Sequence, residues 1–238
     1  MGRIFRRKLL RPSPEGYLPR PRLLAETAPV RLLQVEAPGG AGKTIFLAQW
    51  LAARSHATLW YELDEEDADG SVFAAHLAAG LAALWPGWEA PESPDPVQLA
   101  TELVAEAAAR PPLDLALDRL EHAFGQPYLV DFLAVVLRYA PPGLTLALSS
   151  RAPLPLDGGA LRRGLRTVTA ADLALTPEEA GAVLGQGEWG ECYGVTGGFP
   201  LALEIWRECG ASWRTVLTRR AVAAIGSVSW RRRAARPA

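Results

Sequence analysis

Short apolar runs alternate along the chain with longer segments in which apolar residues recur every three or four positions. The runs are rich in Leu, Val and Ala, as in strands that are buried on both faces of a parallel sheet. They predict five strands, over residues 31–37, 57–63, 113–118, 143–151 and 165–170. The longer segments predict amphipathic helices over residues 44–54, 71–85, 97–110 and 127–140.

After residue 170 the pattern becomes helical. One segment there, TPEEAGAVL, carries a helix-start signature: Thr176 at the N-cap, Pro177 in the first turn and Glu179 three positions after the cap. Strands that alternate with helices favour a five-stranded parallel α/β sheet with helices on both faces, here followed by a small helical subdomain. Ligands of such sheets bind beyond the carboxyl ends of the strands.

The composition is that of a soluble globular protein. The chain has 238 residues, of which 49% are hydrophobic and 21% charged. No apolar run is long enough to span a membrane, and the basic N-terminus lacks the apolar stretch of a secretory signal. The two cysteines, Cys192 and Cys209, have no metal-site spacing. We therefore expect a cytoplasmic protein with no membrane partner.

Charge is unevenly distributed along the sequence. Residues 1–22 carry seven basic residues and one acid, and residues 211–238 carry seven arginines and no acid. The intervening body has a net charge of −14. Basic ends on an acidic body can dock on that body or bind a polyanion, and the sequence leaves both alternatives open.

The segment APGGAGKT, residues 37–44, fits seven of the eight positions of the phosphate-binding loop G-x-x-x-x-G-K-[ST], with Ala37 in place of the first Gly. It follows a predicted strand and opens a predicted helix, as this motif requires. Backbone N–H groups of such a loop surround phosphate oxygens, and the helix dipole adds positive potential. The residues expected to bind nucleotide here are Pro38, Gly39, Gly40, Ala41, Gly42, Lys43, Thr44 and Ile45.

Lys43 is one of two lysines in the chain, and its ammonium would neutralise the β- and γ-phosphates. The Thr44 hydroxyl would bind Mg²⁺. Asp118 ends a predicted strand, where a carboxylate can hold the Mg²⁺ shell through water, although such an Asp can also be a turn residue. Arg151 ends another strand and would sense the γ-phosphate, unless it is a solvated surface residue. We expect Lys43, Asp118 and Arg151 to be the catalytic residues.

With these residues in place, the chain resembles the STAND group of P-loop ATPases, specifically the nucleotide-binding domain of MalT-type bacterial transcriptional activators of the LuxR family. The resemblance runs from about Leu9 to Arg207 and includes the phosphate loop, which in this family commonly begins with Ala. It implies that the Pro-Arg stretch with Arg20 lies on the adenine side of the site. It also implies that Pro200, in TGGFPLAL, packs near the adenine and reports the nucleotide state.

We expect a basic entry segment over residues 1–22, a P-loop nucleotide-binding domain over 23–171, a small helical subdomain over 172–210 and an Arg-rich tail over 211–238. The resemblance implies ATP or ADP with Mg²⁺ as cofactors. Such proteins are switches: ADP holds a silent form, and a small-molecule or protein inducer with ATP opens it. The open form self-associates, and slow hydrolysis resets it.

Two departures from the family pattern bear on function. The magnesium strand usually ends in two acids, but here Arg119 follows Asp118. Glu121 is either a substitute for the missing acid or an exposed loop carboxylate, so slow ATP hydrolysis and nucleotide binding without hydrolysis are both open. The chain also has no helix-turn-helix pattern, so we expect no specific DNA binding from it. The tail is open to three interpretations: a nonspecific contact for phosphate backbones, an unfolded end, or the mark of a shortened or frame-shifted gene.

Overall fold

The computed structural model describes residues 4–27, 30–91, 94–154, 165–185 and 189–216. The chain forms two compact units: Met1–Ala37 with Lys43–Asp172, and Pro38–Gly42 with Leu173–Ala238. We call the first the α/β unit and the second the helical unit. Five residues of the predicted phosphate loop thus belong to the helical unit, although the chain runs directly from them into the α/β unit.

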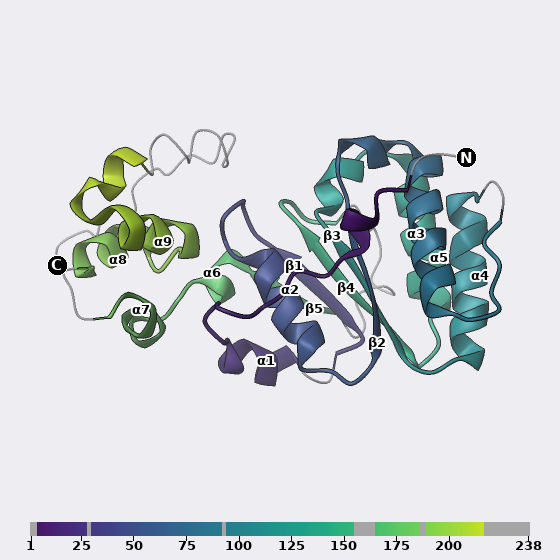
Figure 1. Cartoon of the computed structure of the whole chain (residues 1–238), viewed down its shortest axis with the longest axis horizontal. Coiled ribbons are helices and arrows are strands. Elements are labelled where there is room, and N and C mark those ends of the chain that lie inside the picture. The colour runs from purple at the N-terminus through teal and green to yellow at the C-terminus, as the bar shows by residue number, and fades with distance from the viewer. Residues whose placement is uncertain (1–3, 28–29, 92–93, 155–164, 186–188, 217–238) are drawn as a thin grey trace. The chain divides into compact units, whose positions relative to one another are not determined.

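The α/β unit is built on a five-stranded sheet, drawn as arrows in Figure 1. Its strands are β1 (Leu32–Glu36), β2 (Ala57–Glu62), β3 (Leu113–Asp118), β4 (Leu144–Ser150) and β5 (Leu165–Thr169). Their order is β2-β3-β4-β1-β5, and every pairing is parallel. The predicted five-stranded parallel sheet is therefore confirmed. In this register Glu62 lies opposite Asp118, so polar strand ends gather at one edge.

Helices cover both faces of the sheet (Figure 1). On one side lie α3 (Gly70–Leu84), α4 (Pro96–Ala109) and α5 (Pro127–Tyr139), and on the other lies α2 (Lys43–Ala52). The predicted bounds of these four helices agree with the structure to within two residues. A further short helix, α1 (Pro21–Thr27), was not predicted.

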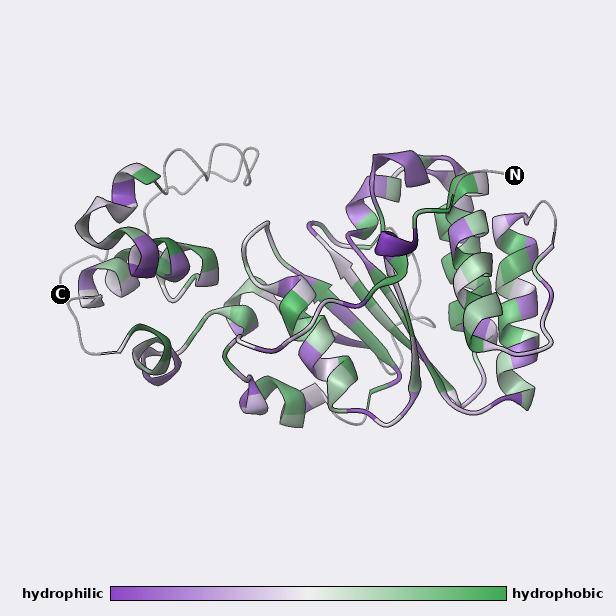
Figure 2. Ribbon diagram, in the orientation of Figure 1, coloured by the Kyte–Doolittle hydropathy of each residue, from purple (hydrophilic) through white to green (hydrophobic). Residues whose placement is uncertain are grey.

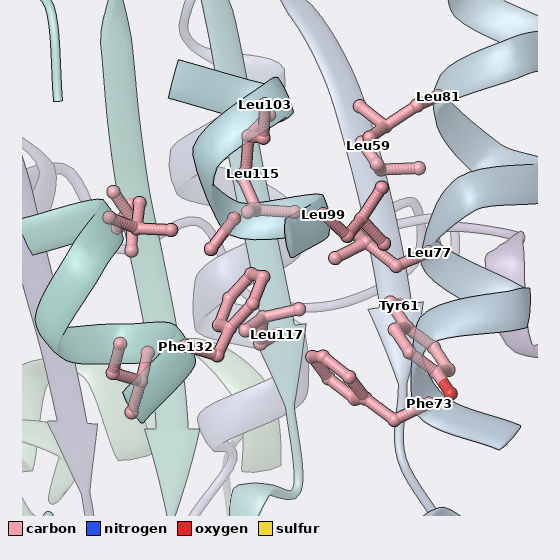
Figure 3. Close-up of a cluster of buried hydrophobic side chains, with 14 of the residues drawn as sticks. Leu59, Tyr61, Phe73, Leu77, Leu81, Leu99, Leu103, Leu115, Leu117 and Phe132 are labelled. Carbon is pink, nitrogen blue, oxygen red and sulfur yellow. The ribbon is translucent and has the colours of Figure 1, made fainter. Parts of the chain in front are cut away.

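The main core lies between the sheet and the layer of α3, α4 and α5. Figure 3 shows leucines of β2 and β3 meeting side chains of these helices, including Phe73 and Phe132. Side chains of a strand alternate between the two faces of a sheet. Leu113, Leu115 and Leu117 of β3 accordingly enter this core, and Asp114 and Asp118 lie on the opposite face, which α2 covers.

Three 3-10 turns of the α/β unit lie outside the predicted strands and helices: η1 (Arg6–Leu9), η2 (Glu65–Ala68) and η3 (Leu120–Ala123). In Figure 2 both η1 and η2 are strongly hydrophilic. Lys8 of η1 joins them, because its Nζ donates to Asp64 at 2.6 Å and to the fully buried Asp67 at 3.0 Å. At this lysine the basic N-terminal segment is docked on the acidic body.

The helical unit contains α7 (Pro177–Leu184), α8 (Gly190–Thr196), α9 (Pro200–Cys209) and η4 (Gly210–Ser212), and a short helix, α6 (Ala170–Leu173), precedes them. The predicted cap of α7 is confirmed: Thr176 Oγ1 accepts from the Glu179 N–H, and the Glu179 carboxylate accepts from the Thr176 N–H. Gly198 has φ +81°, and a Cβ there would lie 2.1 Å from the Leu175 carbonyl oxygen. This position therefore requires glycine.

No helix among the described residues is long and apolar enough to cross a bilayer. Residues 217–238, most of the predicted Arg-rich tail, lie outside the described residues, so the three interpretations of that tail stay as they were.

Candidate functional site

The start of α2 meets the end of β3. The Thr44 hydroxyl donates to Asp118 Oδ2 at 2.8 Å, across 74 residues of sequence. Lys43, the residue before Thr44, is buried, and its Nζ donates to the carbonyl oxygen of Ala37 at 2.7 Å. Three of the predicted site residues thus come together at the carboxyl edge of the sheet.

Asp118 is completely buried, and hydroxyl groups hold its carboxylate. Ser149, in β4, donates to one of its oxygens, and Thr44 donates to the other. Burial raises the pKa of this carboxyl above its usual value, and nearby Glu62 adds to the increase. The two hydroxyl donors and the charge of Lys43 oppose the increase.

Lys43 lies in a mixed electrostatic environment. Burial lowers the pKa of its ammonium, and the positive charges of Arg151 and Arg119 act in the same direction. The negative charges of Glu121 and Asp118 oppose them. The ammonium therefore lies among charges of both signs, and an incoming anion would compete with the two carboxylates for it.

The loop itself explains why Ala37 is tolerated. Gly40 and Gly42 have φ of +81° and +87°, which favour glycine, but Ala37 is not among the positive-φ residues. Ala37 continues the sheet, because its N–H donates to the Ser150 carbonyl at 3.2 Å. An alanine therefore fits the first position of the motif without strain.

The loop residues Pro38–Gly42 pack with α9 inside the helical unit. The Leu201 N–H donates to the Gly40 carbonyl at 3.1 Å, and a Cβ on Gly40 would lie 2.6 Å from Leu201 Cδ2. A Cβ on Gly42 would lie 3.9 Å from Pro200 Cγ. Pro200, which the family resemblance singled out, thus lies beside the phosphate loop, as the first residue of α9.

Two ion pairs flank Asp118. Glu121 binds Arg151 twice: its carboxylate accepts from Nε at 2.9 Å and from the backbone N–H at 3.2 Å. Its side chain is 15% exposed, so it is not the exposed loop carboxylate that was one of its two interpretations. Arg119 pairs with Glu62 at 2.9 Å.

Arg119 has φ +63°, the one positive φ among non-glycine residues of the described chain. Its N–H donates to Ser149 Oγ at 3.1 Å, which ties this turn to the hydroxyl that binds Asp118. From this left-handed backbone position the Arg119 guanidinium reaches Glu62 on the neighbouring strand β2.

Two further residues were predicted to contact the nucleotide, Ile45 and Arg20. Ile45 lies in the first turn of α2 and is half-buried, and Arg20 is buried immediately before α1. Sequence reasoning missed Ser149 and Glu62. Ser149 had a signal, since two serines end the mostly apolar segment LTLALSS, but Glu62 had none that set it apart from the acidic residues that follow it.

The oxygen ligands at this edge suit Mg²⁺. The ion prefers hard oxygen ligands and usually keeps several waters, so that one carboxylate and one hydroxyl with substrate phosphates suffice. Thr44 and Asp118 supply those two groups next to each other. No cluster of three or more His, Cys, Asp or Glu side chains that could cage a metal is found among the described residues.

Comparison with known proteins gives consistent results. A STAND protein with a tetratricopeptide repeat sensor from Pyrococcus horikoshii superposes with a TM-score of 0.63 at 20% identity, over 85% of this chain and 31% of its own. A Walker-type ATPase of Pyrococcus abyssi superposes with a TM-score of 0.56 at 13% identity, over 86% of this chain and 71% of its own. The fold is therefore that of the P-loop ATPases, the STAND proteins among them.

Relatives in sequence are more specific. The HTH-type transcriptional regulator MalT of Cronobacter sakazakii is 33% identical over 73% of this chain, and that of Serratia proteamaculans is 34% identical over 66%. No family model matches the chain. The chain is therefore homologous to one part of the MalT transcriptional regulators. It spans about a fifth of the length of these relatives.

Proposed function

We propose that this chain binds ADP or ATP together with Mg²⁺, as the nucleotide switch of a transcription-regulating STAND ATPase. The observation that carries the proposal is the hydrogen bond of 2.8 Å between Thr44 and Asp118. It joins the predicted phosphate loop to the predicted magnesium strand at the edge where parallel sheets bind ligands.

Each residue has a role in this proposal. The backbone N–H groups of residues 38–44 bind phosphate oxygens, and Lys43 neutralises the β- and γ-phosphates when its ammonium leaves the Ala37 carbonyl. Thr44 and Asp118 hold Mg²⁺, which spreads the negative charge of the phosphates. Arg151 binds the γ-phosphate, Arg20 lies on the adenine side, and Pro200, beside Gly42, responds to the nucleotide state.

We expect turnover to be slow or absent. A carboxylate that orients the attacking water normally contributes about 100-fold or more to such a reaction. At the position after Asp118 this chain has Arg119, whose guanidinium binds Glu62. Nucleotide exchange, rather than rapid hydrolysis, would then set the state of the switch, and an inducer and self-association would act on the same two states.

The test is thermal unfolding with ligand. A ligand that binds the native state at 100 times its Kd adds about 2.7 kcal/mol of stability, which raises Tm by several degrees. We expect MgADP and MgATP to raise the Tm of the wild-type chain, and Lys43→Ala to abolish the increase.

Arg166→Ala is the matched control. It removes one positive charge from the same unit, at the amino end of β5, where Arg166 forms an exposed ion pair with Glu26. This variant should keep the full ligand-dependent increase. An increase that survives Lys43→Ala, or that disappears equally in both variants, would refute the proposed role of Lys43.

A further inference from the structure

Glu121 is bound to a residue that the proposed site uses. Both its carboxylate oxygens face Arg151: one accepts from the guanidinium Nε at 2.9 Å, and the other accepts from the backbone N–H at 3.2 Å. Glu121 lies in η3, just after β3, and Arg151 directly follows β4. The pair therefore bridges two adjacent strand ends at the carboxyl edge.

The same carboxylate acts on Lys43. The negative charges of Glu121 and Asp118 favour the charged form of Lys43 and so oppose the lowering of its pKa by burial. Glu121 thus interacts with both cations that the proposed function assigns to the terminal phosphate, Lys43 and Arg151. A γ-phosphate that approaches them meets a negative charge that is already paired with them.

The order of strands separates this pair from the similar pair Arg119–Glu62. In the order β2-β3-β4-β1, β4 lies between β3 and β1, so the Glu121–Arg151 pair lies on the β1 side of Asp118. Glu62 ends β2, on the opposite side of Asp118. The two pairs have equal N–O distances of 2.9 Å, yet they differ in which side of the site they occupy.

We propose that Glu121 determines the preference of this site between ADP and ATP, because its carboxylate competes with the γ-phosphate for Lys43 and Arg151. The inference rests on the proposed function. In this proposal ADP binds through the loop N–H groups and Lys43, and the ion pair between Glu121 and Arg151 stays intact. ATP must take Arg151 from Glu121 and place its terminal phosphate beside a carboxylate, so its binding is weakened relative to that of ADP.

The test is a ratio of two dissociation constants measured by calorimetry, one for MgADP and one for the magnesium complex of the non-hydrolysable β,γ-imido analogue of ATP. Glu121→Gln keeps the shape of the side chain and removes its charge. We expect the ratio of the analogue's Kd to that of ADP to fall at least about tenfold in this variant. Most of the fall should come from tighter binding of the analogue.

Glu62→Gln is the matched control, because it removes the same charge from a pair of the same N–O distance on the far side of Asp118. In Glu62→Gln, the ratio of the analogue's Kd to that of ADP should stay within about twofold of the wild-type value. An unchanged ratio in Glu121→Gln, or an equal fall in both variants, would overturn the inference while leaving nucleotide binding intact. Failure of the folded wild-type chain to bind either nucleotide would instead overturn the proposed function, and the inference with it.

Discussion

Strand β3 buries one aspartate near each end, and the two ends satisfy their aspartates differently. Asp114 and Asp118 are both completely buried, on the face that α2 covers. Asp114 binds cationic or ionisable groups: Arg54 Nε lies 2.8 Å from one oxygen and His56 Nδ1 lies 2.9 Å from the other. Asp118 instead accepts from the hydroxyls of Thr44 and Ser149.

The difference separates a structural carboxylate from one available to a ligand. A guanidinium neutralises Asp114 within the fold, so this aspartate holds the end of α2 against the sheet. Hydroxyl groups satisfy the hydrogen bonds of Asp118 but carry no net charge, and burial raises the pKa of its carboxyl. A divalent ion that reached Asp118 would supply the positive charge that Arg54 supplies at the other end.

The largest effect on the free energy of unfolding is expected at the amino end of β3, where Asp114 lies. Asp114→Asn removes the charge that faces the mostly buried guanidinium of Arg54. Breaking a buried pair in this way costs about 3 kcal/mol, so the free energy of unfolding in urea should fall by about that amount. In contrast, Asp118→Asn should leave it unchanged or raise it, because burial disfavours the charged form of Asp118. Equal losses in both variants would remove the distinction between the two ends.

The next largest expected effect is on ligand binding. Here the variant at Asp118 should be affected and the variant at Asp114 should not. Asp118→Asn removes the carboxylate charge proposed to hold Mg²⁺, so the affinity for MgADP should fall about 100-fold, which corresponds to about 2.7 kcal/mol. Asp114→Asn, assayed at a temperature where it is folded, should bind as the wild type does. Calorimetric titration of both variants measures this. Normal binding by Asp118→Asn would exclude Asp118 from the magnesium site.

Smaller effects are expected from the hydroxyls at the two ends. Ser149→Ala removes a donor to Asp118 that also accepts from the Arg119 N–H, and loss of such an outer contact lowers metal affinity about tenfold. Thr145→Val, its counterpart, removes an acceptor 3.1 Å from an Arg54 nitrogen and should cost about 1 kcal/mol of stability.

These two variants are compared by titrating Mg²⁺ into each protein with ADP at saturation, and by urea unfolding. Thr145→Val should show the magnesium affinity of the wild type. A weaker affinity for Mg²⁺ in Thr145→Val than in Ser149→Ala would contradict the assignment of Asp114 as the structural carboxylate and Asp118 as the ligand-binding one.

Much of the fold was predictable because its elements have local signals. Strands buried on both faces are continuous apolar runs, and the predicted strands agree with the structure to within one residue at each end. The cap of α7 was equally local, since Thr176 and Glu179 are three residues apart. At the site, Lys43, Thr44 and Asp118 were found through a motif and a strand end, and the structure brings Thr44 to Asp118.

The remaining features depend on pairs that are distant in sequence. Arg119 and Glu62 are 57 residues apart, and Lys8 and Asp67 are 59 apart, so no window of sequence contains either pair. The left-handed backbone of Arg119 has no compositional signal either, because glycine or asparagine is the usual marker of that conformation. The different partners of Asp114 and Asp118 were likewise not predictable from the sequence, because both are aspartates in the same apolar run.

The most direct test of the central claim is calorimetric titration of the wild-type chain with ADP, first with Mg²⁺ and then with excess EDTA. We predict saturable binding with Mg²⁺ that weakens at least about tenfold when the ion is removed, because Asp118 then faces the phosphates without an intervening cation. Absence of binding by well-folded protein, or equal affinity with and without the ion, would contradict the account.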